Sequence, residues 1–222
     1  MKIYAHRGYS EKFPEGTRTA YLEAVNAGAD GFECDVRLTR DKNIVCFHDR
    51  TLKRIAGRSG AVSRLSLIEI QNALDILTLD ELLDIAITHK KDLLIETKHP
   101  VRSSGAIERA VVDLLIRNED AIQKAGIEVA VMSFSFFAVR RLKKIYPHVM
   151  KVIKYRVALW FNRTPNIAIN KDLIFTNHAE LKKFDFEEVY VWTVNSKNEL
   201  HAIKQNSNYK VITDCVERAK VI

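Results

Sequence analysis

Two carboxylates stand two positions apart in the mainly apolar segment 31–37, which reads Gly-Phe-Glu-Cys-Asp-Val-Arg. Side chains alternate across a strand, so Glu33 and Asp35 would project from one face and their apolar neighbours from the other. Two like charges on a buried face repel each other and lose hydration unless a cation lies between them. On its own the pair also fits an acidic strand face in water, so its meaning depends on the other polar residues.

Further polar and aromatic residues follow other strand-like runs of the chain. In an α/β barrel the site is built at the C-terminal ends of the strands, so these residues would converge there. One histidine after a strand is usually structural, but two histidines, three acids and two cations at one end of a barrel predict a site for chemistry. The residues that follow the runs are His6, Arg7, His48, Glu96, Lys98 and Trp192.

The three acids, Glu33, Asp35 and Glu96, form a candidate metal site. No cysteine and no His-x-x-x-His pattern accompanies them, so the ligands would be hard oxygen atoms. Such a set suits Mg²⁺ or Ca²⁺ better than Zn²⁺. We therefore expect one divalent metal ion, either magnesium or calcium, as the cofactor.

The cations and histidines indicate what the metal would act on. Arg7 and Lys98 would make the mouth of the barrel attractive to a phosphate group. Imidazole is the side chain whose ordinary pKa lies near neutrality, so His6 and His48 are candidates for the general base and general acid. The assembled residues predict metal-dependent cleavage of a phosphodiester.

The attacking oxygen is not expected to come from the protein. No Ser, Cys or Thr lies in an activated-nucleophile pattern, and Cys34, between the two strand acids, should point away from them. Water or a hydroxyl of the substrate itself would then attack. A hydroxyl one carbon from the phosphoester would gain a large advantage in effective molarity.

The elements that must position these residues follow from periodicity, because short strand-type runs alternate with helical periods. Eight strands in 222 residues predict a compact (β/α)8 TIM barrel, with a doubly wound open sheet as the alternative. The expected strands are 2–5, 31–36, 92–95, 128–132, 149–154, 173–175, 188–192 and 210–212. The expected helices are 17–27, 79–88, 104–117, 136–146, 180–184 and 197–204, and 156–170 is expected to be a connection.

The second strand is expected to continue through a polar turn at 40–43 into a hairpin-like extension at 44–49, which returns His48 towards the acids. The following segment, about 50–71, is rich in Arg and Lys and has the pattern of an insertion. It could be a basic loop in water or a ligand-binding element. Residues 1–222 are predicted to form a single domain that includes this insertion.

Composition indicates the kind of partner. Lys plus Arg number 35 against 28 Asp plus Glu, which gives a net charge of +7 and a pI near 9.3 and favours anionic partners. No arginine-rich tail or RNP-like pattern is present, so no nucleic-acid partner is expected. The apolar segment 157–161, and the insertion with Leu65, Leu67 and Ile68, could contact an anionic membrane transiently, although core packing is preferred for both.

The three cysteines, Cys34, Cys46 and Cys215, are odd in number and far apart, which fits free thiols in a reducing compartment. The N-terminus has no apolar core of a signal peptide, and the longest apolar stretch, 129–139, is interrupted by serines. A cytoplasmic location is therefore expected.

Several short motifs, in order along nearly the whole chain, resemble the glycerophosphodiester phosphodiesterase family. No single motif is specific, but their combination is. The motifs are Ala-His-Arg-Gly at 5–8, Phe-Pro-Glu-Gly-Thr at 13–17, Phe-Glu-Cys-Asp-Val at 32–36, Phe-His-Asp at 47–49, Leu-Ile-Glu-Thr-Lys at 94–98, Ser-Phe-Ser at 133–135, Val-Trp-Thr-Val-Asn at 191–195 and Ile-Thr-Asp at 212–214.

The resemblance implies a (β/α)8 barrel with a small insertion after the second strand. It also implies site roles for individual residues: Glu33, Asp35 and Glu96 as metal ligands, His6 and His48 as the acid/base pair, Arg7 and Lys98 as phosphate contacts, Trp192 as an apolar wall beside the glycerol, and Glu15 as a further substrate contact. The chain departs from the family at Gly16, where Asn is usual, at Leu77, where Pro is usual, and at Cys215, which also replaces a Pro. None of these positions belongs to the catalytic set.

Three functions are compared. The resemblance favours an enzyme that cleaves deacylated phospholipid head groups, such as glycerophosphocholine, into glycerol 3-phosphate and an alcohol. The alternatives are a lysophospholipase D and a barrel that binds phosphorylated ligands or membrane without turnover. A binder would need the cations but not two histidines, so the residues favour an enzyme.

Overall fold

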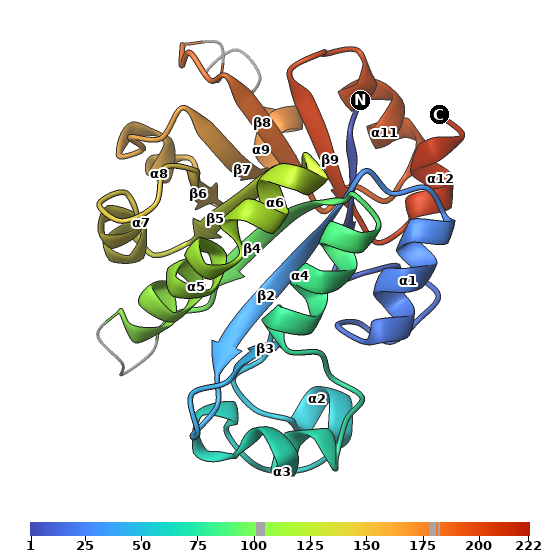
Figure 1. The fold of residues 1–222 in the computed structure, drawn as a ribbon. Helices are drawn as coiled ribbons and strands as arrows, with labels where there is room; N and C mark the ends of the chain where they lie inside the picture. The colour runs from blue at the N-terminus through green and yellow to red at the C-terminus, as the bar shows by residue number, and fades with distance from the viewer. Residues whose placement is uncertain (101–104, 178–180, 182) are drawn as a thin grey trace.

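Eight parallel strands close into a barrel in the computed structural model, which describes residues 1–100, 105–177, 181 and 183–222 (Figure 1). β1 pairs with both β2 and β9, which closes the sheet and confirms the predicted TIM barrel over an open sheet. The short β3, Ile44–Cys46, runs antiparallel to β2 and extends it. The barrel strands are β1 Ile3–His6, β2 Gly31–Leu38, β4 Asp92–Thr97, β5 Val129–Ser133, β6 Val149–Ile153, β7 Asn166–Asn170, β8 Glu188–Trp192 and β9 Tyr209–Thr213.

Helices surround the barrel on its outside (Figure 1). The predicted helices 79–88 and 197–204 have the expected bounds, whereas the predicted helix 136–146 ends earlier, at Leu142. Residue 104 of one predicted helix and parts of the predicted helix 180–184 lie outside the described residues. The helices are α1 Arg18–Asn26, α4 Leu79–Thr88, α5 Ala106–Arg117, α6 Glu119–Ala125, α7 Phe136–Leu142, α8 Val157–Trp160, α9 Lys171–Thr176, α11 Lys197–Lys204 and α12 Val216–Lys220.

Side-chain caps fix where the helices begin. Thr78 accepts a hydrogen bond from the backbone N–H of Glu81, and the Glu81 carboxylate accepts one from the backbone of Thr78. Ser196 and Glu199 form the same reciprocal pair at the start of α11. Each pair satisfies backbone N–H groups that a helix end otherwise leaves without partners, so these short sequences define the helix starts.

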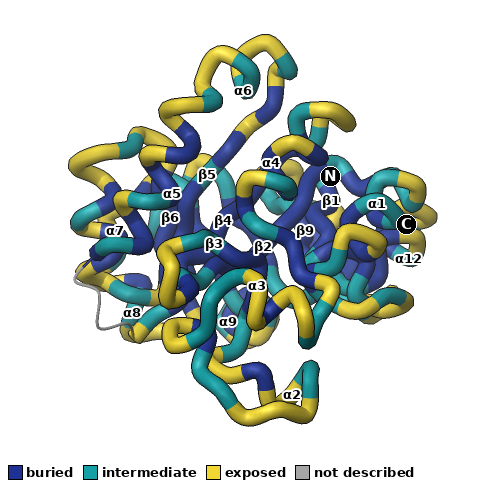
Figure 2. Tube along the Cα trace, turned by 60° about the horizontal axis from the view of Figure 1, so that its bottom comes forward, coloured by how far each residue is buried: buried dark blue, intermediate teal, exposed yellow. Residues whose placement is uncertain are grey.

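Two apolar layers hold the barrel. The larger layer lies between the strands and the surrounding helices and includes Phe32, Cys34 and Val36, so Cys34 points away from the acids as predicted. The smaller layer fills the barrel interior, which makes the barrel a packed core rather than a pore. Figure 2 shows the buried strands at the centre and exposed positions on the helices and loops. The interior residues are Tyr4, Leu94, Met132, Met150, Val152, Ala168, Tyr190 and Ile212.

The insertion after β3 is ordered and has an apolar cluster of its own. It contains α2 Lys53–Ala56, a 3-10 turn at Val62–Arg64 and α3 Leu67–Gln71. Leu65 and Leu67 pack against its buried residues, as the preferred interpretation expected, whereas Ile68 is exposed. The buried residues of this cluster are Val45, Phe47, Leu52, Val62, Ile70 and Ile76.

One predicted strand is wrong. Residues 173–175 lie in α9, and the seventh barrel strand is β7, inside the segment that was expected to be a connection. Asn170 explains the shift, because its side chain accepts from the backbone N–H of Asp172 and begins a helix there. In β7 the residues alternate: Ile167 and Ile169 face the helices and Ala168 faces the interior.

Among the described residues, no helix is both long and apolar enough to cross a membrane.

Candidate active site

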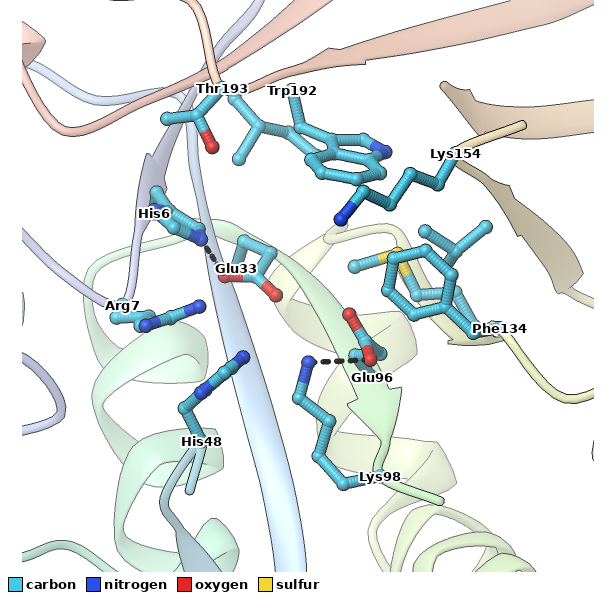
Figure 3. A pocket seen from close by; sticks show the side chains of 13 residues that line it. His6, Arg7, Glu33, His48, Glu96, Lys98, Phe134, Lys154, Trp192 and Thr193 are labelled. Atoms are coloured by element: carbon cyan, nitrogen blue, oxygen red, sulfur yellow. Dashed lines mark hydrogen bonds and ion pairs between the residues drawn. The ribbon is translucent and has the colours of Figure 1, made fainter. Parts of the chain in front are cut away.

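A cavity of about 260 Å³ opens at the C-terminal ends of the barrel strands. In Figure 3, His6, Arg7 and His48 lie on one side of it, Trp192, Lys154 and Phe134 on the other, and Glu33 between them. The buried Met132, Val152 and Ile212 of the barrel interior also line it and form its floor. The lining residues are His6, Arg7, Glu33, His48, Glu96, Lys98, Met132, Phe134, Val152, Lys154, Trp192, Thr193 and Ile212.

Strand register brings the three acids together. Glu33 and Asp35 lie on one face of β2, and Asp35 pairs in register with Glu96 on the neighbouring β4. All three carboxylates are buried, and one oxygen atom from each lies within 4.8 Å of the others. The predicted convergence of these acids is therefore present in the structure.

The buried acids differ in pKa. Burial, reinforced by the negative charge of Asp35, raises the pKa of Glu33 to about 7 and that of Glu96 to about 8. Burial would also raise the pKa of Asp35, but the neighbouring Lys98 and Arg7 outweigh it and lower this pKa to about 2. The cluster thus carries one firmly ionised carboxylate and two that would ionise more readily beside an added cation.

Lys98 and Arg7 contact the cluster directly. The Lys98 ammonium forms an ion pair with Asp35 Oδ1 at 2.7 Å and donates to Glu96 Oε1 at 2.6 Å. Arg7 Nε lies 2.7 Å from Asp35 Oδ2, although the two atoms are not aligned as a hydrogen bond. Both side chains also line the cavity, where their remaining N–H groups can bind an anion.

The backbone turns sharply at Arg7 to place this side chain. Arg7 has a φ of 57° and is followed by Gly8 with a φ of 85°, while the Arg7 N–H donates to the Glu33 carbonyl at 2.9 Å. A Cβ atom on Gly8 would lie 2.7 Å from Ala20. Position 8 therefore requires glycine for both its conformation and its close approach to α1.

Each histidine is oriented by a carboxylate. His6 Nδ1 is hydrogen-bonded to Asp214 Oδ1 at 2.6 Å, and His48 Nδ1 to Asp49 Oδ1 at 2.6 Å. His6 Nε2 lies 3.9 Å from Glu33 Oε2. Because a carboxylate holds Nδ1 of each ring, Nε2 is the nitrogen that each histidine offers for proton transfer.

The two histidines differ in pKa. Burial opposes charge on His6, but the hydrogen bond to Asp214 and the charge of Glu33 outweigh it and raise the His6 pKa. Burial lowers the pKa of His48 and Lys98 adds to this effect, against the opposing charge of Asp35. His6 is thus favoured in its protonated form and His48 in its neutral form.

Sequence reasoning did not assign roles to Asp49 and Asp214, although both lie within the quoted motifs. The signal for Asp49 is its place directly after His48. Asp214 follows β9, the last strand, and closure of the barrel brings β9 beside β1, which ends at His6. Asn195 donates to Asp214 Oδ2 at 2.7 Å and holds this carboxylate in place.

Glu15, predicted as a substrate contact, lies behind Arg7 and is not among the residues that line the 260 Å³ cavity. Its carboxylate accepts from Arg7 at 3.1 Å and from both terminal nitrogens of Arg54, at 2.9 and 2.7 Å. Arg54 Nε donates to Asp49 Oδ2 at 2.6 Å. Arg54 therefore links the insertion to Glu15, which contacts Arg7, and to Asp49, which holds His48. The basic composition of the insertion did not predict this role.

The aromatic wall lies opposite the histidines. The rings of Trp192 and Phe134 meet edge to face with centroids 5.5 Å apart. Both line the cavity, so the predicted wall at Trp192 is present and is extended by Phe134. An apolar wall facing a charged one suits a ligand with a carbon skeleton on one side and an anionic group on the other.

The acid cluster fits a divalent cation. Glu33 Oε2 and Asp35 Oδ2 are buried, and neither has a hydrogen-bond partner among the described residues. Carboxylate oxygens at this spacing are the ligand atoms that Mg²⁺ and Ca²⁺ prefer, and a bound cation would offset the burial and the Asp35 charge that raise the pKa values of Glu33 and Glu96.

Comparisons with known proteins agree on one family. A sequence model described as "Glycerophosphoryl diester phosphodiesterase family" matches residues 6–218. A probable glycerophosphodiester phosphodiesterase 1 of Mycobacterium tuberculosis is 30% identical, over 89% of this chain and 83% of the relative. A glycerophosphodiester phosphodiesterase of Caldanaerobacter subterraneus is 29% identical, over 96% of this chain and 93% of the relative.

Solved structures share the fold. A phosphodiesterase of Oleispira antarctica, solved in complex with the product sn-glycerol-3-phosphate, has a TM-score of 0.83 and 21% identity, over 100% of this chain and 96% of that one. A glycerophosphodiester phosphodiesterase of Agrobacterium tumefaciens has a TM-score of 0.79 and 21% identity, over the full length of both chains.

Proposed function

Since the chain belongs to the glycerophosphoryl diester phosphodiesterase family, we propose that it hydrolyses glycerophosphodiesters, the deacylated forms of phospholipids, to glycerol 3-phosphate and an alcohol. It is an enzyme of the phosphoric diester hydrolase class. One observation carries the proposal: two histidines, each held at Nδ1 by a carboxylate, face the same cavity as Arg7, Lys98 and two members of the acid cluster, Glu33 and Glu96.

We propose that Glu33, Asp35 and Glu96 hold one divalent ion, Mg²⁺ or Ca²⁺. When bound, such an ion supplies positive charge to the phosphoryl oxygens as negative charge develops on them. The support is the fit of the acid cluster described above.

Arg7 and Lys98 orient the phosphate, because each reaches the cavity from a carboxylate that fixes its position. Trp192 and Phe134 pack against the glycerol carbons on the opposite side. A substrate held between these walls has its phosphorus near the two histidine Nε2 atoms, which is the orientation that acid/base catalysis requires.

Proton transfer then divides between the histidines. Neutral His48 accepts, at Nε2, the proton of the glycerol 2-hydroxyl as that oxygen bonds to phosphorus. Protonated His6 donates its Nε2 proton to the departing head-group oxygen as the original P–O bond breaks, leaving a cyclic phosphate. In the second step the roles reverse: His6 accepts a proton from water, which attacks phosphorus, and His48 returns its proton to the 2-oxygen. The opposite pKa directions of the two histidines support this division.

The size of the cavity supports deacylated substrates. About 260 Å³ is slightly below the usual range of ligand pockets and suits a head group with its glycerol phosphate rather than an acyl chain. A lysophospholipid would have to leave its acyl chain outside the cavity.

We also propose a cytoplasmic location, which the three buried free cysteines support.

A panel assay tests the function. Purified protein is incubated with glycerophosphocholine, glycerophosphoethanolamine, glycerophosphoglycerol and a lysophospholipid, with Mg²⁺, with Ca²⁺ or with excess chelator, and the products are identified. We expect glycerol 3-phosphate from the deacylated diesters, loss of turnover in chelator and recovery with a hard divalent ion. Full activity in excess chelator would contradict the metal site, and cleavage of the lysophospholipid alone would contradict the substrate class.

Variants separate the roles of the residues. His6→Ala and His48→Ala should each lower turnover by about 10² to 10⁴-fold, the usual contribution of a positioned acid or base. Both should still bind metal, whereas Glu33→Gln and Asp35→Asn should lose metal affinity as well as rate. An analogue lacking only the 2-hydroxyl should bind competitively without being cleaved, and its hydrolysis at a comparable rate would show direct attack by water.

A further inference from the structure

We propose that an exposed aromatic rim beside the cavity docks the enzyme on a bilayer that contains anionic phospholipids. The rim is defined as Phe134, Phe136, Phe137, Tyr155 and Val157. The inference goes beyond the proposed function and rests on it at one point, namely that the substrates are derived from phospholipids.

The rim residues are unusually exposed for their type. Their relative exposures run from 40% for Phe134 to 67% for Phe137. The three phenylalanines of the rim follow β5, whereas Tyr155 and Val157 follow the adjacent parallel strand β6. Both sets of residues therefore lie at the mouth of the barrel. Lys151 of β6 donates to the Phe134 carbonyl and joins the segment after β5 to β6. Apolar surface that gathers at one place usually marks a contact site, whereas single exposed apolar residues do not.

The rim is continuous with the cavity. Phe134 belongs to both, since it lines the cavity and packs against Trp192. Lys154, which also lines the cavity, lies 5.7 Å from the centroid of the Tyr155 ring. A surface that contacts the rim would therefore lie directly beside the opening through which substrate enters.

The positive charge of the chain is concentrated in the part of the sequence that carries the rim, called here the sector. Residues 129–171, which run from β5 into the first residue of α9, contain nine Lys and Arg and no Asp or Glu. The rest of the chain has 26 basic and 28 acidic residues and a net charge of −2. Arg141 and Lys171 are paired with acids outside these residues, and the other seven cations still give this sector an excess of positive charge, which matches an anionic surface.

Helix α7 joins the two properties. Its buried residues face the barrel, while Phe136, Phe137 and Arg140 are exposed. Arg140 follows the two phenylalanines by four and three positions, so all three lie on the same side of the helix. Aromatic residues flanked by cations are typical of helices and loops that lie at a bilayer surface.

Exposed aromatic residues with cations also occur on proteins that bind single-stranded nucleic acid. The continuity of the rim with a cavity suited to glycerophosphodiesters favours a lipid surface here. Nucleic acid and a second copy of the chain are therefore treated as outcomes of the test.

Vesicle flotation at about 100 mM salt tests the proposal, with the intact chain and vesicles of phosphatidylglycerol and phosphatidylcholine or of phosphatidylcholine alone. The key variant is Phe137→Ser/Val157→Ser, and Arg140→Gln tests charge. Matched controls are Ile116→Ser/Val221→Ser, two exposed apolar residues outside the rim, and Lys124→Gln, an exposed cation outside the sector. We expect the double rim variant to bind anionic vesicles at least about tenfold more weakly than the parent and controls.

The parent should also bind vesicles of phosphatidylcholine alone at least about tenfold more weakly, because the cations lose their partners. Turnover of a soluble glycerophosphodiester should stay unchanged in the rim variants. Vesicle binding is measured without substrate turnover, so a failure of the proposed function would be distinguished from a failure of this proposal. Equal vesicle binding by parent and rim variant would overturn the proposal. So would tighter rim-dependent binding of a single-stranded oligonucleotide, or a dimer that dissociates in the rim variant.

Discussion

At the scale of single residues, the site is built from pairs in which one partner is proposed to do chemistry and the other holds it. His6 with Asp214 and His48 with Asp49 follow this pattern, with hydrogen bonds of 2.6 Å in both pairs. The chemical partners can be predicted from the sequence because histidine after a strand suits proton transfer. The holding partners cannot, because Asp is common at strand ends and only the closed barrel shows which one reaches a histidine.

Asp214→Asn should shift the pH dependence of turnover. Asp214 helps to raise the His6 pKa against burial, so loss of its charge lowers that pKa, and His6 then loses its proton at a lower pH. The alkaline limb of the pH–rate profile should move to lower pH, and the rate at pH 8 should fall at least about tenfold. The measurement is kcat against pH for parent and variant. An unmoved alkaline limb would show that His6 is not the acid in the first step.

Arg54 should act as a positioning residue, since it holds both Glu15 and Asp49. Arg54→Ala should lower kcat/KM by about 10- to 100-fold, the usual effect of removing a group that orients catalytic residues. Arg54→Lys should recover only part of the rate, because an ammonium does not form the two-pronged contact with Glu15. Arg58→Ala in the same insertion is the control and should be near normal. Equal rates in Arg54→Ala, Arg54→Lys and Arg58→Ala would show that Arg54 is only a surface charge and does not position the site.

At the scale of elements, the structure separates what periodicity predicts from what it does not. Helices 79–88 and 197–204 have the predicted bounds because a capping pair marks their starts. The strand predicted at 173–175 is helical because an apolar triplet of this length fits either element, and the deciding residue is the cap at Asn170. β7 was missed because two asparagines flank only three apolar residues, a run too short to stand out in an aromatic-rich connection.

Helices α5 and α7 are joined by a partly buried ion pair that should respond to acid. Glu108 of α5 accepts from Arg141 of α7, and His99 lies 3.3 Å from the same carboxylate. Burial would raise the Glu108 pKa, but His99 and Arg141 lower it to about 2. Because the folded pKa is depressed, the pair stabilises the protein above the ordinary pKa of a glutamate, and this contribution is lost as the pH falls from about 4.5 towards 2.

Glu108→Gln should therefore cost roughly 1–3 kcal/mol of unfolding free energy at pH 7, the usual penalty for leaving a buried donor without its partner. The difference from the parent should narrow as the pH falls towards 2, which urea unfolding at several pH values would measure. Asp113→Asn on the same helix is the control. A constant difference across the pH range would contradict the assignment.

At the scale of the whole molecule, the barrel, its helices and the insertion contact one another around the site. We propose that residues 1–222 unfold as one domain, because Val45 of β3 belongs to the apolar cluster of the insertion while β3 itself extends a barrel strand. The count of strands predicted the barrel but left an open sheet as the alternative, because periodicity does not show closure. The ordered interior of the insertion could not be predicted, since its apolar residues are spaced among charges.

Divalent ions should stabilise the folded chain. Three buried acids repel one another, and an ion bound only to the folded state at 100 times its dissociation constant adds about 2.7 kcal/mol. For a chain of this size the midpoint of thermal unfolding should rise by roughly 5–10 °C. Glu96→Gln should lose most of this increment without losing stability in chelator, because burial and Asp35 raise the Glu96 pKa to about 8 and leave this side chain largely protonated at pH 7 when no ion is bound. An equal increment in both proteins would place the ion elsewhere.

The floor of the cavity has a consequence for the order of events. Met132, Val152 and Ile212 close its base, so every molecule that reaches the histidines enters and leaves through the mouth of the barrel. In the proposed two-step route, the liberated head-group alcohol would then lie between the cyclic phosphate and the water that must open it. While the alcohol stays, it occupies the place of that water and can attack in its stead, restoring the starting diester. Net hydrolysis thus depends on how readily the alcohol departs, and a bulky or retained alcohol turns the first step into a reversible exchange of one head group for another.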